Sequence, residues 1–230
     1  MLWLEFIICS SLMVYFAYRL CLEGVIVSQR TSIEEGLIGM FFLALATSFP
    51  EAATGATAVL YLGKPALGYG DIIGSIIVNL MILFFLDIYR GKGRILSGLA
   101  RTNRLTGVFA FVLIVAVLFF SLLRSAGIPL PSFRGIGIES FLMTLMYLAC
   151  LEVVRRNGTE GEAAGLEGEK ETIFQIWFKF FALLAVVTVL GVWLARIGDK
   201  ITETTELSQT FVGMPFLGIS TSLPEMIVSF

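Results

Sequence analysis

A segment of thirteen residues occurs twice in the chain, and this repeat constrains the fold more than any other feature. The first copy covers residues 39–51 and the second, 174 positions later, covers 213–225, with identical residues at eight of the thirteen positions. Each copy places a proline and a glutamate within an apolar stretch. A proline interrupts helical hydrogen bonding and an ionised carboxylate is costly in an apolar medium, so repeating both indicates a function.

The composition is that of a polytopic membrane protein, with 57% hydrophobic and 15% charged residues. The sequence contains no histidine, which excludes histidine zinc sites and Ser-His or Cys-His catalytic centres. Its three cysteines are scattered without a CxxC pair and are typical of apolar packing. It has no basic, aromatic-rich segment of the kind that binds nucleic acid. Any metal site must therefore use oxygen ligands.

Seven apolar stretches are long enough to cross a hydrocarbon core, which needs about 20 residues. They lie at residues 2–18, 36–62, 66–89, 105–123, 136–154, 173–195 and 208–230. The first lacks a basic leader and a cleavage site, so we interpret it as a transmembrane helix rather than a signal peptide. Because lipid offers the backbone no hydrogen-bond partners, we expect all of them to be helices and the chain to be an all-α membrane protein.

Basic residues between the spans indicate the orientation. With the N-terminus outside, the inner loops hold ten lysines and arginines and the outer loops hold five. Most of the difference comes from the cluster at residues 90–104. The distribution predicts a multi-pass protein of the cell membrane, plasma or inner, with its N-terminus outside.

A segment rich in glycine and glutamate, residues 156–172, predicts a flexible cytoplasmic connector between a first half (1–155) and a second half (173–230). The repeated motif occupies the second span of each half. These two spans are an odd number of crossings apart and must run in opposite directions, which predicts an inverted-topology repeat. Three more spans would complete the second half, so we expect a truncated sequence from a protein of about ten spans.

The prolines of the motif predict free backbone carbonyls. Pro50 leaves the carbonyl of Ala46 without its helical partner, and Pro224 does the same for Ser220. Such carbonyls are available to a cation. A simple helix kink is the structural alternative.

Each copy of the motif also carries a threonine and a glutamate four residues apart, on one helix face, with a serine beside them. These residues are Thr47, Ser48 and Glu51 in the first copy and Thr221, Ser222 and Glu225 in the second. Hydroxyls often bond only to their own helix, but a carboxylate at the centre of a membrane helix costs about 2.5–3.5 kcal/mol. Two such glutamates favour a site for a hard cation such as Ca²⁺ or Na⁺.

The third span carries a polar stripe, because Asp71, Ser75 and Asn79 recur every four residues. Gly70 and Gly74 beside it permit close helix approach. The stripe predicts either hydrogen bonds between helices or ligands to a cation.

These segments resemble the alpha repeats of the sodium/calcium exchanger membrane region, in the cation/calcium antiporter superfamily. The resemblance rests on two Thr-Ser-x-Pro-Glu copies and one Gly-x-x-x-Gly-Ser-x-x-x-Asn segment. It implies ten helices in two inverted halves, with Ca²⁺ and Na⁺ as transported ions, no cofactor and no enzyme activity. The implied ion ligands are Thr47, Ser48, Glu51, Ser75, Asn79, Thr221, Ser222 and Glu225.

Three positions depart from the family pattern. Where the family has a glycine before Thr-Ser, this chain has Ala46 in one copy and Ser220 in the other. Where the third span of the family opens with Gly-Asn, this chain has Asp71 in place of the asparagine. Ile76 replaces a further asparagine. The resemblance therefore predicts the binding of a cation more firmly than it predicts which ions are exchanged.

The sequence predicts competitive antiport, in which Ca²⁺ and Na⁺ alternate at one site that opens to either side of the membrane. Proton coupling, with the glutamates as proton carriers, is the alternative. A GxGD pattern at residues 68–71 also suggests an intramembrane aspartyl protease, but Asp87 is about 24 Å along the same helix and Asp199 lies in a predicted loop. A membrane scaffold without transport is a further alternative.

Overall fold

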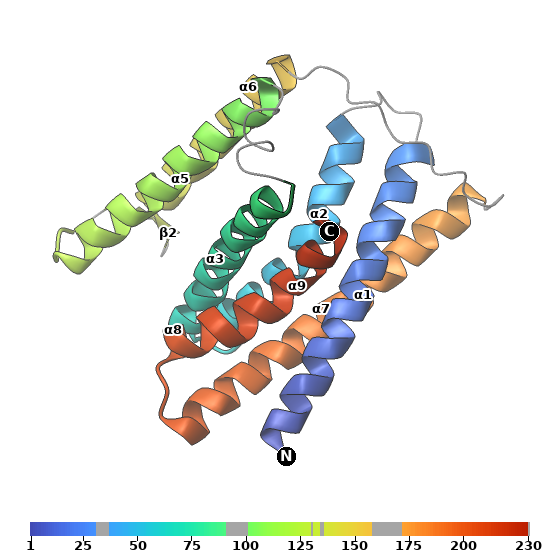
Figure 1. Cartoon of the computed structure of the whole chain (residues 1–230). Coiled ribbons are helices and arrows are strands. Elements are labelled where there is room, and N and C mark those ends of the chain that lie inside the picture. Colours follow the sequence, from blue (N-terminus) through green and yellow to red (C-terminus); the bar gives the residue numbers. More distant parts are fainter. Residues whose placement is uncertain (31–36, 91–100, 130, 134–135, 158–171, 230) are drawn as a thin grey trace. The chain divides into compact units, whose positions relative to one another are not determined.

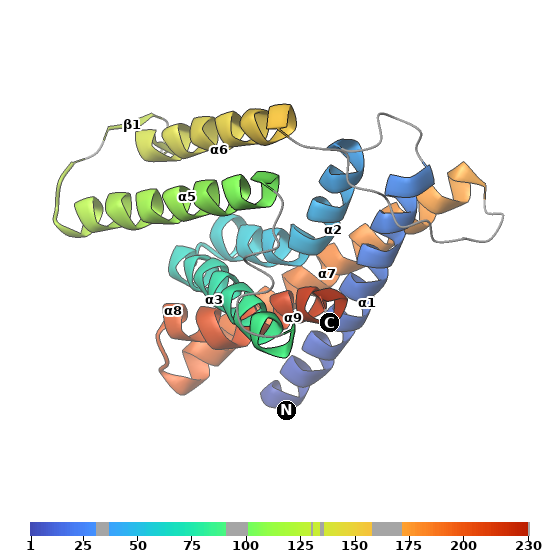
Figure 2. The same ribbon diagram turned by 45° about the horizontal axis from the view of Figure 1, so that its top comes forward.

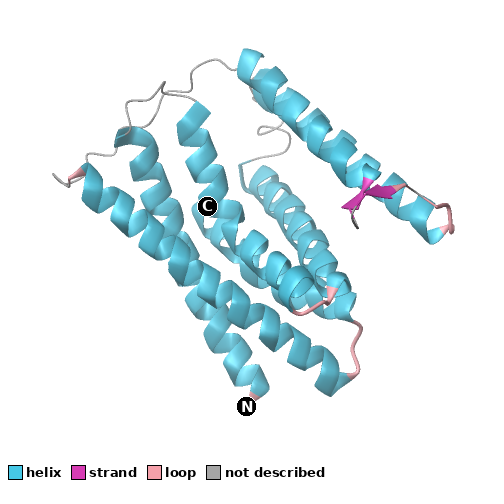
Figure 3. Cartoon of the chain, turned by 180° about the vertical axis from the view of Figure 1, so that it is seen from behind, coloured by secondary structure: helices cyan, strands magenta, loops and turns pink. Residues whose placement is uncertain are grey.

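The computed structural model describes residues 1–30, 37–90, 101–129, 131–133, 136–157 and 172–229. Nearly all of these residues are helical, as Figure 3 shows. The helices are α1 (Leu2–Arg30), α2 (Leu37–Ala56), α3 (Pro65–Arg90), α5 (Arg101–Ser125), α6 (Ile138–Asn157), α7 (Ile173–Thr205), α8 (Gln209–Val212) and α9 (Gly218–Ser229), with π-helical segments η1 (Thr57–Tyr61) and η2 (Gly213–Leu217). The prediction of an all-α membrane protein is confirmed.

Within the described residues, four helical stretches are long and apolar enough to cross a membrane. They are Leu2–Val27, Pro65–Tyr89, Gly107–Ser125 and Ile173–Thr205, and α6 contains the shorter apolar stretch Ile138–Cys150. The other two expected spans are those that carry the repeated motif. Each of these contains a π-helical segment, η1 after α2 and η2 between α8 and α9.

Two helices extend well past the expected spans, because α1 continues to Arg30 and α7 to Thr205. The expected first span stopped before the charged residue Arg19. A single charge does not end a helix, and Leu20 and Val27 beyond it are buried in the apolar core. Most of the predicted connector lies outside the described residues.

The chain divides into two compact units, Met1–Gly91 with Glu162–Phe230, and Lys92–Gly161. The second unit contains α5 and α6, joined through a short antiparallel pair of strands, β1 (Ser132–Phe133) and β2 (Ile136–Gly137). An ion pair between Arg124 and Glu139 connects the end of α5 to the start of α6. The repeated motif and the polar stripe both lie in the first unit.

Packing of α1 against α7 forms the apolar core of the first unit, and the two helices lie side by side in Figures 1 and 2. Met13 and Leu20 of α1 and Phe180 and Leu194 of α7 are fully buried in this core. The helix α9 contacts α1, α2 and α3. Figure 1 shows α2 and the α8–η2–α9 segment running in opposite directions, as the odd number of crossings predicts.

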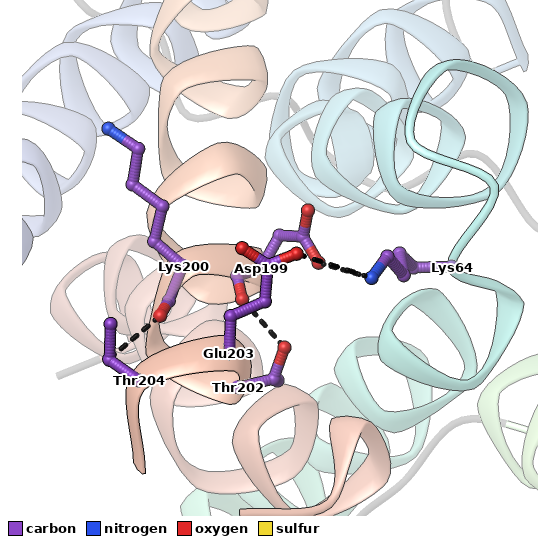
Figure 4. A network of polar contacts seen from close by, with 6 residues as sticks. All are labelled: Lys64, Asp199, Lys200, Thr202, Glu203 and Thr204. Atoms are coloured by element: carbon purple, nitrogen blue, oxygen red, sulfur yellow. Dashed lines mark hydrogen bonds and ion pairs between the residues drawn. The ribbon is translucent and has the colours of Figure 1, made fainter. Parts of the chain in front are cut away.

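Polar contacts connect the turn before α3 to the C-terminal part of α7 (Figure 4). The ammonium of Lys64 lies 3.2 Å from Asp199 Oδ1 and 3.7 Å from Glu203 Oε1. Arg196 donates a hydrogen bond of 3.0 Å to the Tyr61 hydroxyl and lies 5.1 Å from the centre of its ring. These contacts hold the ends of η1 and α7 together.

Candidate cation site

The two copies of the motif meet α3 in the first unit. The first copy lies on α2, and the second begins at the first residue of η2 and ends on α9. Both Pro50 and Pro224 lie inside helices that continue past them. A proline has no amide hydrogen, so the carbonyls of Ala46 and Ser220 lose the donor that a regular helix would give them. The prediction of free carbonyls thus rests on the position of each proline within its own helix.

Glycines allow α3 to pack directly on the second copy. A Cβ added at Gly218 would lie 2.7 Å from the backbone of Gly74 and 2.8 Å from the amide nitrogen of Ser75. A Cβ added at Gly70 would lie 2.6 Å from the carbonyl oxygen of Thr210. Backbone atoms cannot move aside as a flexible side chain can. The close approach predicted for the glycines of α3 is therefore present, and it brings the polar stripe against α9.

A hydrogen bond joins the two copies of the motif. Ser222 of α9 donates to Glu51 Oε1 of α2 at 3.1 Å. The second carboxylate oxygen of Glu51 is buried and accepts no hydrogen bond from any residue that the structure describes. An oxygen of this kind is available to a cation.

The glutamate of the second copy lies near that of the first. Electrostatic interaction connects Glu51 with Glu225, so the two acids occupy the same region between α2 and α9. A hydrogen bond joins Glu225 to the side chain of Asn79 on α3. The Asn79 side-chain oxygen is buried without a hydrogen-bond partner among the described residues. Each copy thus contacts a residue that the resemblance places in the ligand set.

A second group of oxygens lies between α3 and α9. The hydroxyl of Thr221, which is fully buried, lies 3.2 Å from that of Ser75 and 3.3 Å from Asp71 Oδ1. The same Thr221 hydroxyl lies within hydrogen-bond distance of the carbonyl oxygens of Leu217 and Gly218. The elements α3, η2 and α9 therefore contribute oxygens to one buried region.

The structure does not bring all predicted ligands together. Thr47 is half-buried on α2, and Ser48 is exposed. Neighbouring residues on a helix point about 100° apart, so Thr47 and Ser48 lie at different angles around α2. In the described part of the chain, Ser48 forms no hydrogen bond with another predicted ligand.

Two contacts in this region were not expected from the sequence. Asp71 was identified on the polar stripe but not as a partner of Thr221, because nothing in the sequence aligns α3 with α9 residue by residue. Ser10 of α1 lies 2.9 Å from Ser220, hydroxyl to hydroxyl. A pair of serines, Ser10 and Ser11, in an apolar helix gives no signal of such a contact.

Among the described residues, no group of three or more Cys, Asp or Glu side chains has the arrangement of a metal centre. A cation held here must therefore combine the glutamates with hydroxyl, amide and carbonyl oxygens. That mixture is typical of hard cations such as Ca²⁺, which bind flexible sets of oxygen ligands.

Comparison with known proteins decides the family. A family profile described as sodium/calcium exchanger protein matches residues 1–154 and 175–230. The chain belongs to the sodium/calcium exchanger family. An uncharacterized membrane protein of Methanocaldococcus jannaschii is 24% identical over 205 residues, covering 88% of this chain and 62% of that relative. The chain therefore spans about three-fifths of the relative's length, and no solved structure matches it.

Proposed function

We propose that this member of the exchanger family takes part in exchanging Ca²⁺ for Na⁺ across the cell membrane, with Glu51 and Glu225 as the central ligands. The hydrogen bond between Glu51 and Ser222 carries the proposal, because it joins oxygens from both copies of the motif at one partly buried position. Family membership supports cation transport in general. The ion pair exchanged and the orientation with the N-terminus outside belong to the proposal.

The proposed mechanism follows from the cost of burying charge. Two ionised glutamates close together in an apolar region repel each other and lose hydration, so an empty site is unfavourable. One Ca²⁺ or several Na⁺ neutralise the same carboxylates, and each ion binds only when the other has left. An empty site is hindered from changing its exposure, whereas a loaded site can turn from one side of the membrane to the other.

Proton coupling is a second candidate, and Asp71 favours it. A buried carboxylate with an oxygen that lacks a partner among the described residues can be neutralised by a proton as well as by a metal cation. In that case the driving gradient is one of pH rather than of Na⁺.

Transport in proteoliposomes separates the candidates. We expect an outward Na⁺ gradient to drive ⁴⁵Ca²⁺ uptake by the full-length protein, and a pH gradient in Na⁺-free buffer to drive none. A Na⁺ ionophore that removes the gradient is the control and should abolish uptake. Uptake that follows the pH gradient would establish proton coupling instead, and absence of uptake under both gradients would contradict antiport.

A further inference from the structure

Asp71 is the most completely buried acid near the predicted site, yet the ligand set implied by the family does not include it. Its side chain is 0% exposed. One carboxylate oxygen, Oδ1, lies 3.3 Å from the Thr221 hydroxyl. The other, Oδ2, is buried and has no hydrogen-bond partner among the described residues. The family pattern has an asparagine here, so the negative charge is a property of this chain.

Among the described residues, hydrogen-bond donors reach only one of the two carboxylate oxygens of Asp71. Thr221 and Ser75 each supply a single hydroxyl proton. Within reach of the Thr221 hydroxyl lie Asp71 Oδ1 at 3.3 Å and the carbonyl oxygens of Leu217 and Gly218 at 3.1 Å and 3.3 Å. Asp71 Oδ2 adds an acceptor that has no donor among the described residues. A buried carboxylate oxygen without a donor requires a partner, such as an ion, a water molecule or a proton.

Among the described residues, no basic side chain forms an ion pair with Asp71. Lys64 and Arg124 form ion pairs with other acids, namely Asp199, Glu203 and Glu139. An isolated carboxylate in a low-dielectric interior is strongly unfavourable. Electrostatic interaction with Glu51 makes the region more negative still.

We propose that Asp71, Ser75 and Thr221 form a second cation position, between α3 and α9, that takes Na⁺. This inference rests on the proposed antiport function and adds a residue to it. The carboxylate of Asp71 balances the charge of one monovalent ion, and Glu51 nearby stays available for the proposed Ca²⁺. The hydroxyl and carbonyl oxygens beside it are hard donors of the kind that Na⁺ accepts. The direct backbone packing of Gly74 on Gly218 holds α3 and α9 close together, so that these oxygens lie within one small region.

The test is the number of Na⁺ ions bound by the full-length protein, measured with ²²Na⁺ by equilibrium dialysis at constant ionic strength with choline. We expect Asp71→Asn to bind one Na⁺ fewer per chain than the wild type. Asp87→Asn removes the same charge from the same helix, outside this group of oxygens, and should bind the wild-type number. An unchanged number in Asp71→Asn would overturn the proposal, and would leave a proton as the partner of this acid.

A second variant decides the matter if Asp71→Asn does not fold, as judged by gel filtration and circular dichroism. Ser75→Ala removes one hydroxyl and keeps the charge, and we expect Na⁺ binding at the proposed position to weaken at least fivefold. Unchanged Na⁺ affinity in this variant would overturn the proposal. The proposed function is tested separately through Ca²⁺ binding by Glu51→Gln, so the two can fail independently.

Discussion

Ser222 is the residue that most directly joins the two copies of the motif. Its side chain is buried and donates to Glu51 Oε1 from the opposite copy. A hydroxyl in this position holds the carboxylate in place and offers its own lone pairs to a bound ion. Removing it changes the geometry of Glu51 without changing the charge of the site.

We predict that Ser222→Ala weakens Ca²⁺ binding about tenfold or more, because a hydrogen bond to a charged group contributes about 1.5–3 kcal/mol. Isothermal titration calorimetry on the purified protein measures the change. The matched control is Ser11→Ala, since the exposed Ser11 hydroxyl bonds only to the carbonyl of Ile7 one turn back. Equal weakening in both variants would show that the effect is not specific to the site.

At this scale the sequence predicts which residues matter better than it predicts their partners. The spacing of Thr221 and Glu225 identified oxygen donors on one helix face, and both lie in the buried region. The contacts of Asp71 with Thr221 and of Ser10 with Ser220 depend on how helices align across space. Periodicity within one helix carries no information about that alignment.

Among the elements, the pairing of α3 with η2 and α9 determines the position of the polar stripe. Gly70 and Gly74 face a backbone that also presents glycines, at Gly213 and Gly218. Such contacts need small residues on both helices. The glycine spacing in α3 was visible in the sequence, but its partner was not, because the π-helical turn of η2 changes which residues face α3.

We predict that Gly218→Ala destabilises the protein by about 1–3 kcal/mol, because the new methyl group would lie 2.7 Å from backbone atoms of Gly74. Thermal unfolding in detergent measures the change. Gly55→Ala is the matched control, since a Cβ there meets no atom within 4 Å. Alanine is the better helix former by about 0.5–1 kcal/mol, so this variant should be slightly more stable than the wild type. Equal destabilisation of both variants would contradict the packing described.

The contact between Lys64 and Asp199 gives a prediction on pH. The hydrogen bond from Lys64 to Asp199 raises the pKa of the Lys64 ammonium above its ordinary value. A base with a raised pKa stabilises the folded state below its ordinary pKa, about 10.4, and this contribution disappears as the pH rises through the raised value. We predict that Lys64→Met lowers the unfolding temperature between pH 6 and 9, with a difference from the wild type that shrinks above pH 10.

The control for this prediction is Lys200→Met, because Lys200 lies at the same end of α7 and forms no ion pair within the described residues. It should show no pH-dependent difference from the wild type. A Lys64→Met difference that persists unchanged above the raised pKa would attribute the effect to packing instead of charge.

At the scale of the whole molecule, the proposed site requires two helices of similar sequence, α2 and α9, that run in opposite directions and meet α3 (Figure 1). The repeat and the composition were sufficient to predict this membrane class and the pairing of the two copies. They could not predict that α1 and α7 would extend so far beyond the expected spans, since burial of residues such as Val27 depends on tertiary packing. The proposed ion exchange requires that both copies of the motif bind the same ion.

Equilibrium Ca²⁺ binding tests that claim most directly, with Glu51→Gln, Glu225→Gln, the double variant and the exposed control Glu203→Gln measured side by side in the full-length protein. If one ion is shared, each single substitution reduces Ca²⁺ affinity at least a hundredfold, the double variant loses little more, and the control binds as the wild type does. If either single variant retains wild-type affinity, or if the two losses add independently, the two glutamates do not hold one Ca²⁺ between them and the account is wrong.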